Sequence, residues 1–295
     1  MTLLTLACGG DDRYAIGVAV TLYSALVNLG PAVEAVHLAI LDGGIGPENR
    51  LRLERVLQKG AQKAGRPVHI EFLSVDTSAF QVYRARQTYL NAAAYMRLLL
   101  PNLLPDATTQ VLYLDSDLVI RGDVSQISGP PQEAAAAYAA PDPLFTNLQQ
   151  SGLPKTCPAL ALDPQAPYFN SGVMVLDLGL WRQQHLVNRC LSYLEQYGGR
   201  LRFADQDVLN AVLAGQWRPL NPVWNTYALQ WHDSPDAQVW HFVGPHKPWQ
   251  IYYPWKPPWQ AFAHYLFASS WFTGPEFVQW WLQSLGRMVQ QTLAR

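Results

Sequence analysis

Cysteine is scarce in this chain of 295 residues, which carries only Cys8, Cys157 and Cys190. No two of them have the Cys-x-x-Cys spacing, and this pattern argues against a thiolate zinc site and favours a reducing compartment. Charge is modest too, since charged residues make up 15% of the chain and the formal net charge is −1. The overall charge therefore gives no reason to expect a nucleic-acid partner.

Long hydrophobic runs, internal repeats and low-complexity tracts are missing as well. No apolar stretch reaches about 18 residues, so we expect no transmembrane helix and a soluble, cytoplasmic protein. The residues Thr5–Cys8 resemble a lipoprotein cleavage site, but no basic segment precedes them and the apolar run is too short. The length suits one large α/β domain with an appendage.

The first 73 residues alternate between strand and helix patterns. The patterns predict strands over 3–8, 33–41 and 68–73, and helices over 15–28 and 47–63. This order predicts a parallel sheet with right-handed crossovers. Ligands bind beyond the carboxyl ends of such strands, so the loop 9–14 and two aspartates described next would share one rim.

An apolar run over 111–120 is interrupted by Asp115, Ser116 and Asp117. Two aspartates one residue apart point to opposite sides of a straight strand, so the chain must bend if both are to bind one ion. We therefore place them at the C-terminal end of a buried strand, where a hard divalent cation and a phosphate could bind. Taken alone, the pattern is short, and an acidic turn after a core strand is the simpler explanation.

A second pattern over 239–249 places His241, Gly244 and Lys247 at three-residue steps. The imidazole suits a borderline metal such as manganese, the glycine lets the backbone approach a phosphate, and the lysine supplies a point charge. The Asp-x-Asp pair and this His-x-x-Gly-x-x-Lys-Pro-Trp motif together resemble glycosyltransferase family 8, which includes bacterial lipopolysaccharide galactosyltransferases and glycogenin. The resemblance runs from about Leu3 to Trp249.

The resemblance implies a GT-A-type α/β fold over 1–249, with a Rossmann-like, mostly parallel sheet flanked by helices. It also implies retaining transfer of glucose or galactose from a UDP-sugar to a hydroxyl of a glycan, glycolipid or protein. The metal, Mn²⁺ or Mg²⁺, would be held by Asp115, Asp117 and His241. Ser116, Gly244 and Lys247 would contact the donor.

The loop 9–14 offers groups that suit a nucleoside. Gly9 lets the backbone close on a ribose, Asp11 can accept hydrogen bonds from a base, and Tyr14 can stack on it. An acidic cap on the following helix is the alternative. Family 8 uses this position for the uridine, so the resemblance implies donor contacts for Gly9, Asp11, Arg13 and Tyr14, although the family often has a small polar residue where this chain has Arg13.

Four further donor contacts are implied by the resemblance. Arg97, in an apolar helix predicted over 91–100, would lie near the diphosphate and sugar, although snorkelling to solvent is the alternative. Asp142 begins a loop over 141–168 that we expect to cover the site, and it would lie near the sugar. Asn170 and Gly172, in a strand over 168–177, would also contact the donor. A turn residue and a strand end remain alternatives for Asp142 and Asn170.

A helix is predicted over 178–197, and another begins near Asp205 and Gln206. Acidic residues at a helix start could simply complement its dipole. The resemblance instead gives Asp205 a contact with sugar hydroxyls and places Gln206 beneath the anomeric carbon. Because an amide is a poor nucleophile, Gln206 better suits stabilising an oxocarbenium-like centre, with the acceptor attacking from the face that UDP leaves.

Residues 250–295 are rich in tryptophan, tyrosine and phenylalanine, and prolines predict turns and brief helices, with a short helix from Gly286 onward. This aromatic density suits a lid or dimer surface, and also a carbohydrate platform or peripheral contact with the inner face of a membrane. Lys256, Arg287 and Arg295 are the only lysines and arginines, so a polybasic anchor is weakly supported. Packing or dimer contact is the preferred interpretation.

Three rival functions are weaker. Asp115-x-Asp117-x-Val119 also fits the first motif of haloacid-dehalogenase-like phosphatases, but that motif usually opens its domain and the later acidic motif is missing. A non-catalytic relic that binds a sugar nucleotide or glycan would have lost a metal ligand or the lysine, and both remain. A nucleotidyltransferase would not account for the pattern over 239–249.

Overall fold

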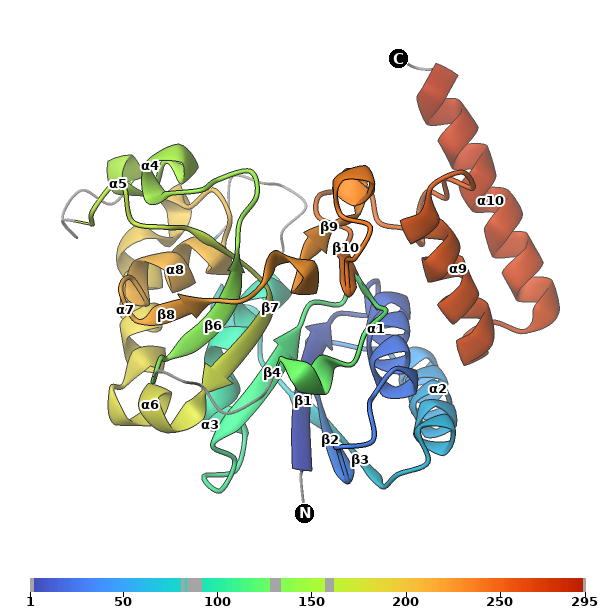
Figure 1. Ribbon diagram of the computed structural model, residues 1–295, viewed down its shortest axis with the longest axis horizontal. Coiled ribbons are helices and arrows are strands. Elements are labelled where there is room, and N and C mark those ends of the chain that lie inside the picture. Colours follow the sequence, from blue (N-terminus) through green and yellow to red (C-terminus); the bar gives the residue numbers. More distant parts are fainter. Residues whose placement is uncertain (1–2, 81–82, 84–91, 128–133, 157–161, 294–295) are drawn as a thin grey trace.

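The computed structural model describes residues 3–80, 83, 92–127, 134–156 and 162–293. Its centre is a seven-stranded sheet in the order β3-β2-β1-β4-β7-β6-β8 (Figure 1). The first four strands in this order are parallel, and β7 runs antiparallel to β4 and β6. The predicted α/β fold with a mostly parallel sheet is confirmed. The strand bounds are β1 Leu3–Gly10, β2 Ala35–Asp42, β3 Val68–Ser74, β4 Gln110–Leu114, β6 Ala137–Pro141, β7 Phe169–Asp177 and β8 Trp217–Pro219.

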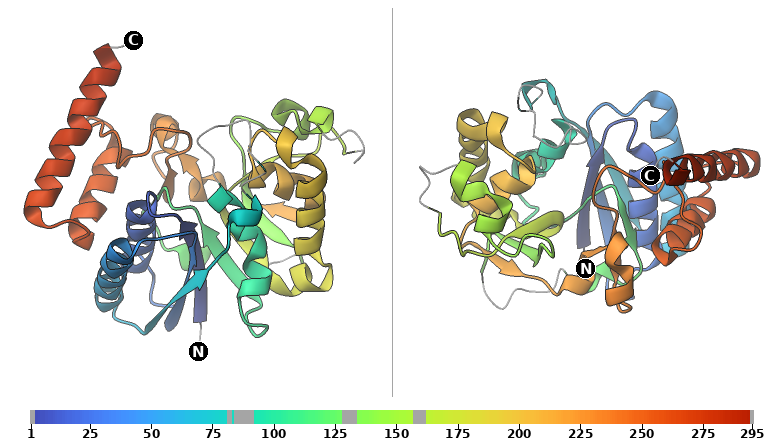
Figure 2. Two further views of the ribbon diagram at one scale, coloured as in Figure 1. Left: turned by 180° about the vertical axis from the view of Figure 1, so that it is seen from behind. Right: turned by 90° about the horizontal axis from the view of Figure 1, so that it is seen from above.

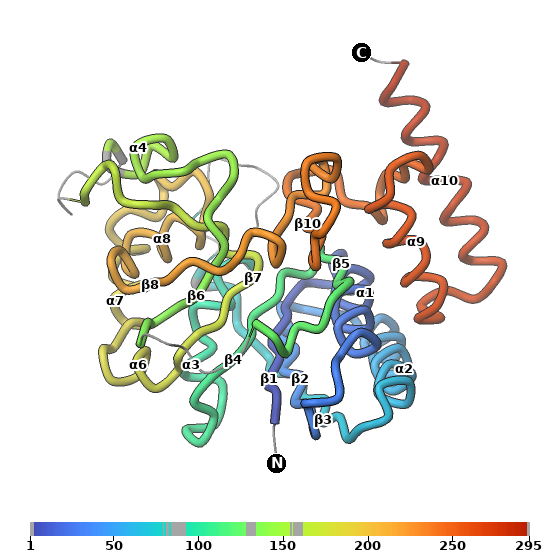
Figure 3. Tube along the Cα trace, viewed as in Figure 1, coloured from blue at the N-terminus to red at the C-terminus, as the bar shows by residue number. Residues whose placement is uncertain are grey.

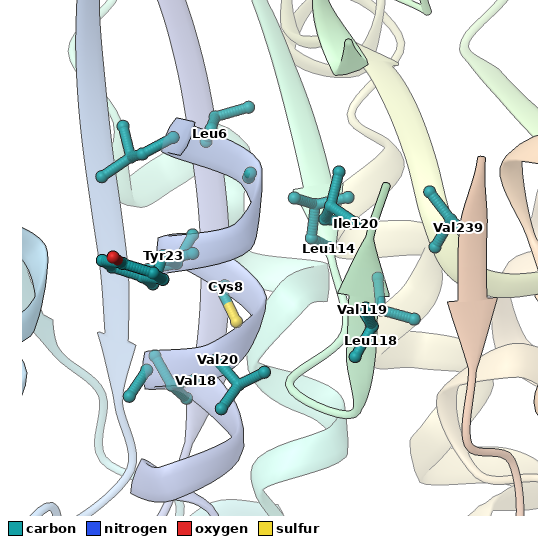
Figure 4. Packing of buried hydrophobic residues seen from close by; sticks show 14 of the residues in the cluster. Leu6, Cys8, Val18, Val20, Tyr23, Leu114, Leu118, Val119, Ile120 and Val239 are labelled. Atoms are coloured by element: carbon teal, nitrogen blue, oxygen red, sulfur yellow. The ribbon is translucent and has the colours of Figure 1, made fainter. Parts of the chain in front are cut away.

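Both faces of this sheet are buried, which explains the nearly continuous apolar runs of its central strands. Alternate residues such as Leu6 and Leu114 pack towards α1 (Ala15–Val27) and α2 (Pro47–Ala64). Figure 4 shows part of this layer, with side chains of α1 close to those of β1, β4 and β5. The intervening residues pack against the second core, which includes α6 (Leu178–Gln183), α7 (Leu186–Tyr197) and α8 (Asp205–Val212).

Three local predictions need correction. β1 continues through Gly9 and Gly10, because both residues pair with β2, so the loop begins at Asp11. The helix predicted over 178–197 is two helices, because His185 adopts a left-handed conformation with φ of 53°. The helix predicted over 91–100 is a 3₁₀ helix, η2 (Ala92–Leu99), followed by α3 (Leu100–Leu103). Residue 91 lies outside the described residues.

The segment 141–168 contains two short helices, α4 (Leu148–Ser151) and α5 (Leu153–Thr156). Residues 157–161, and with them Cys157, lie outside the described residues. Helices thus occupy part of a segment whose prolines and glycines predicted only loop. Among the described residues, no helix combines the length and apolar character that crossing a membrane requires.

A second, three-stranded sheet forms at the carboxyl end of β4 (Figure 3). It consists of β5 (Leu118–Ile120), β10 (Val239–His241) and β9 (Thr226–Tyr227). β5 pairs antiparallel with β10, and this register places His241 opposite Leu118. The predicted bend at the aspartates therefore occurs where the chain passes from one sheet to the other.

The C-terminal residues form two substantial helices, α9 (Pro257–Ser269) and α10 (Gly274–Leu293). The prediction of brief helices and of a helix start at Gly286 is wrong, because Gly286 lies inside the 20-residue α10. Pro257, Pro258 and Pro275 fall in the first turns of these helices, where their missing N–H groups cost no hydrogen bond. A single exposed glycine in a helix costs only about 1 kcal/mol.

α9 packs against α1 and α2, whereas α10 lies outside α9 and ends away from the sheet (Figure 2). Trp280 fastens α10 to this layer: it is buried among Tyr252, Phe262 and Phe277, and its Nε1 donates a hydrogen bond to the carbonyl of Trp249 over 2.9 Å. The neighbouring Trp281 is 38% exposed, compared with 6% for Trp280.

These two tryptophans provide a test of the packing. Trp280→Ala should lower the free energy of unfolding by about 3–5 kcal/mol, because it removes a large buried side chain and a hydrogen bond. Trp281→Ala is the matched control and should cost less than about 1 kcal/mol. Urea denaturation would measure both values, and equal costs would contradict the arrangement of α10.

Candidate functional site

The structure brings together the three residues that the sequence predicted as metal ligands. His241 Nε2 lies 3.2 Å from Asp117 Oδ1 and 3.6 Å from Asp115 Oδ2. One ligand atom from each residue lies within 4.8 Å of the others. Backbone hydrogen bonds hold both aspartates in place: Asp115 donates to Gly172 over 2.8 Å, and Phe242 donates to Asp117 over 3.0 Å.

A chain of hydrogen bonds fixes the tautomer of His241. The Gly172 N–H donates to Asn170 Oδ1, so that atom must be an acceptor. Asn225 then faces Asn170 with its Nδ2 and turns its Oδ1 towards His241 Nδ1, at 2.8 Å in both cases. Since Asn225 Oδ1 can only accept, the proton of His241 lies on Nδ1 and Nε2 faces the two carboxylates.

This geometry fits a metal ion. The Nε2 atom of His241 faces two carboxylates, and the three groups together require positive charge between them. A proton on Nε2 or a divalent cation would supply that charge. Two carboxylates and one imidazole are a donor set that Mn²⁺ accepts well.

Lys247 provides a second cation at the same point. Its Nζ lies 2.5 Å from Asp117 Oδ2 and 3.0 Å from the carbonyl oxygen of Phe242, and the side chain is almost fully buried. Burial by itself would raise the pKa of Asp117, but Lys247 and His241 lower that pKa well below its usual range. Asp117 is therefore a carboxylate at neutral pH.

Arg97 connects Asp115 to Asp205, the first residue of α8. Its guanidinium lies 2.7 Å from Asp115 Oδ1 and 3.0 Å from Asp205 Oδ2, and it donates to the carbonyl of Ser171 over 2.8 Å. Burial would lower the pKa of Arg97, but the two carboxylates raise it above its ordinary value. Arg97 is buried, with 7% of its surface exposed, so the alternative that it snorkels to solvent is wrong, whereas its contact with a donor stays a prediction.

Asp205 is a buried acid whose pKa is shifted in the opposite direction to that of Asp117. Burial raises the pKa of Asp205 to about 7, although Arg97 opposes this rise. Ser171 Oγ also donates to it over 3.3 Å. A carboxyl group with this pKa exists in both protonation states near neutral pH, so it can accept or donate a hydrogen bond to a ligand hydroxyl.

Gln206, which follows Asp205 in α8, is held by a network of hydrogen bonds. Its Oε1 accepts from Asn170 Nδ2 over 2.9 Å and from the Ser171 N–H over 3.2 Å. Its Nε2 donates to Asp142 Oδ2 over 3.2 Å, and Tyr227 donates to the same oxygen over 2.8 Å. The other oxygen of Asp142 accepts from the backbone of the turn at 144–145. Asp142 thus serves both a turn and this network.

The loop after β1 lies beside the aspartates, as predicted. Asp11 accepts hydrogen bonds from the backbone N–H groups of Arg13 and Tyr14, so it caps its own turn. Tyr14 contacts Trp249 edge to face, with ring centroids 5.4 Å apart. The Arg13 side chain is exposed and pairs with Asp11 over 3.2 Å. Arg13 is not among the residues that line the cavities described next.

Two cavities meet at this cluster. The smaller, of about 100 Å³, is lined by Gly9 at the end of β1, by Asp11 and Tyr14 of the loop that follows, and by Ser116. The larger, of about 330 Å³, is lined by Asp142, Asn170, Asp205, Gln206 and Gly244. Their shared wall consists of Ala94, Arg97, Asp115, Asp117 and Lys247. The charged residues of this wall therefore lie between the two cavities.

Two glycines are required at their positions for different reasons. A Cβ on Gly172 would lie 2.3 Å from His241 Cε1, so any side chain there would displace the imidazole. Gly172 is thus a packing residue, and it does not line either cavity. Gly244 has φ of +100°, a backbone conformation that other residues rarely adopt.

Several residues at the site were missed by sequence reasoning. Asn225 and Tyr227 belong to the segment around the two-residue strand β9, which has no detectable pattern of its own. Tyr113 was assigned only to the buried strand, yet its hydroxyl donates to Asp115 Oδ1 over 2.9 Å. Arg202 and Phe145 line the larger cavity. Only their places in the tertiary structure reveal these contacts.

The chain is similar to several known proteins. The sequence profile of "Glycosyl transferase family 8" matches residues 5–251. General stress protein A of Bacillus subtilis is 29% identical over 287 residues, which are 89% of this chain and 93% of that protein. The lipopolysaccharide 1,2-glucosyltransferase of Escherichia coli is 28% identical over 83% of this chain and 72% of its own length.

Among solved structures, galactosyltransferase LgtC in complex with donor and acceptor sugar analogues superposes with a TM-score of 0.76. The two chains are 23% identical, and the superposition covers 94% of this chain and 100% of LgtC. At that identity the likeness supports the fold. The profile match spans most of the chain and both motifs around which the site is built, so the chain belongs to glycosyl transferase family 8 and is a hexosyltransferase.

Proposed function

We propose that this protein transfers glucose or galactose from a UDP-sugar, with retention of configuration, to a hydroxyl of a glycan or glycolipid. The convergence of Asp115, Asp117 and His241 beside Lys247 carries this proposal, because it puts metal ligands and a cation where a diphosphate would have to lie. This arrangement of side chains fits a transferase better than it fits a phosphatase or a non-catalytic protein that binds a sugar nucleotide or glycan. A phosphatase would need a free aspartate nucleophile, whereas Asp115 is bound by Arg97 and Tyr113.

The two cavities suggest how the donor binds. The nucleoside would lie in the smaller one, against Tyr14 and Asp11, and the hexose in the larger one, near Asp205 and Gln206. The diphosphate would then cross the shared wall, within reach of Lys247 and Arg97. When bound to Asp115, Asp117 and His241, Mn²⁺ would neutralise charge on the leaving diphosphate.

A third cavity indicates where the acceptor would bind. It has a volume of about 370 Å³ and shares Leu144, Tyr227, His241 and Val243 with the hexose cavity. Aromatic side chains, Phe242, Tyr253 and Trp259, line its far side together with Lys256. Aromatic rings stack well on the apolar faces of sugars, so this lining supports a carbohydrate-containing acceptor.

The contacts of Gln206 favour same-face attack by the acceptor. Its amide is held by three hydrogen bonds, so it presents a fixed dipole to the anomeric centre and is not poised as a nucleophile. The alternative nucleophile, Asp205, is bound by Arg97 and partly protonated near neutral pH. A departing phosphate oxygen would then help to deprotonate the acceptor hydroxyl.

We further propose that residues 1–249 form the catalytic unit and that 250–295 form a supporting extension, in a protein that works in the cytoplasm. α10 exposes apolar side chains that no described residue covers, and these would provide a peripheral membrane contact or a homodimer contact: Val278, Leu282, Val289 and Leu293.

The metal site can be tested with Asp117→Asn. This change removes one carboxylate ligand while keeping the shape of the side chain, and we expect Mn²⁺-dependent UDP binding to be lost. Isothermal titration calorimetry with and without Mn²⁺ would measure it, with circular dichroism as a check of folding. Asp106→Asn, at a fully exposed position, is the control and should behave as wild type. Unchanged Mn²⁺ dependence in Asp117→Asn would remove the metal-site assignment.

Lys247→Met tests the phosphate contact. Loss of a charge-assisted hydrogen bond costs about 1.5–3 kcal/mol, so UDP should bind roughly ten- to a hundredfold more weakly and turnover should fall similarly. Mn²⁺ alone should bind at least as tightly as in wild type, because Asp117 loses a competing cation. Lys63→Met, on the surface of α2, serves as control. Wild-type UDP affinity in Lys247→Met would show that the lysine serves only Asp117.

Gln206→Ala separates the two retaining mechanisms. If the amide only stabilises charge, activity should fall by about a hundred- to a thousandfold or less, and the product should keep the configuration of the donor. Intact-mass measurement after incubation with donor alone checks for a covalent intermediate. A hexose adduct on Asp205 or Gln206 that the acceptor discharges would overturn same-face attack. An adduct on a tyrosine hydroxyl would instead identify self-glucosylation and redirect the search for the acceptor.

A further inference from the structure

A second group of metal-binding side chains lies on the main sheet, away from the catalytic cluster. His37 belongs to β2, and His69 and Glu71 belong to β3, the strand at the edge of the sheet (Figure 1). His37 and His69 are register partners in the parallel pairing of these strands, and Glu71 follows two residues after His69. Since side chains alternate between the faces of a strand, all three leave the sheet on the same side.

The distances within this group suit a metal ion. His37 Nε2 lies 2.9 Å from Glu71 Oε2, and the rings of His37 and His69 are 5.2 Å apart between centroids. One ligand atom from each residue lies within 4.8 Å of the others. A tetrahedral zinc ion with bonds of about 2.1 Å holds its ligand atoms roughly 3.4 Å apart, so small rotations of these side chains would complete the shell.

The surroundings leave room for those rotations. The His69 residue is exposed and the Glu71 side chain is 38% exposed, whereas the His37 side chain is 12% exposed and supplies a fixed point. Water can therefore fill the fourth position. Among the residues that the structure describes, this group and the Asp115–Asp117–His241 cluster are the two that gather three such ligands.

The donor sets of the two groups differ. Two imidazoles and one carboxylate favour Zn²⁺, Co²⁺ or Ni²⁺ over Mn²⁺, which prefers the two carboxylates of the catalytic cluster. Their positions differ too, because His37 and His69 lie near the starts of their strands, whereas Asp115 follows the carboxyl end of β4. We propose that His37, His69 and Glu71 form a second metal site, of zinc type, that fastens the edge strand β3 to β2.

A zinc titration in a background without the catalytic site tests this proposal. Full-length Asp117→Asn protein, freed of metal, should bind one Zn²⁺. Adding His69→Gln should weaken that binding at least about a hundredfold, since even partners that only orient a ligand contribute ten- to a hundredfold. Adding His264→Gln instead, an exposed histidine on α9, should leave it unchanged. Co²⁺ substitution should give the visible absorption of a four-coordinate ion in the first and third proteins only.

Stability and activity provide independent readouts. Zn²⁺ at a hundredfold excess over Kd should raise the unfolding temperature by roughly 3–8 °C, and His69→Gln should abolish this rise. Transferase activity with Mn²⁺ should be the same in His69→Gln and wild type, because the group lies at the opposite end of the sheet. The proposal is overturned if Asp117→Asn binds no Zn²⁺ tighter than about 100 μM, or if His69→Gln leaves the zinc affinity unchanged.

Discussion

The balance of buried charge at the carboxyl end of β4 is the constraint on which this site depends. Asp115, Asp117 and Asp205 lie close together with little access to water, and carboxylates in such a place remain charged only with cationic partners. Arg97 pairs with two of the three, and Lys247 with the third. Each cation comes from a different part of the chain, so the charge balance ties η2, α8 and the segment after β10 to the same strand end.

This balance of charge is compatible with the proposed binding of a metal ion and a diphosphate at one site. A metal ion at the proposed site would compete with Lys247 for the oxygens of Asp117, and a diphosphate would offer Lys247 a replacement partner of the same sign. A metal ion could therefore replace Lys247 beside Asp117, and each carboxylate would still have a cationic partner. His241 takes part with only one nitrogen, since the other is committed to Asn225.

Much of this could be predicted from the sequence, and the failures have physical causes. The β1, α1, β2, α2 and β3 region was predictable because each element carries its own periodicity and its own stop signals. Asp115, Asp117, His241 and Lys247 were predictable because their types and spacings form motifs. Asn225 and Tyr227 were not, because a two-residue strand carries no periodicity. The length of α10 was missed because Pro275 and Gly286 were taken as helix breakers, although the proline lies in the first turn.

The pairing of β5 with β10 has a consequence for the order in which the molecule is made. Asp117 and Lys247 are 130 positions apart in the chain. The pairing of the three residues of β10 with β5 brings His241 and Lys247 to the two aspartates. A nascent chain that has made β1 to β4 and β5 therefore has Asp115 with its partner Arg97, but it has Asp117 without His241 or Lys247. During synthesis the cluster is complete only after β10 and Lys247 have left the ribosome, and until then Asp117 lacks the lysine that balances its charge.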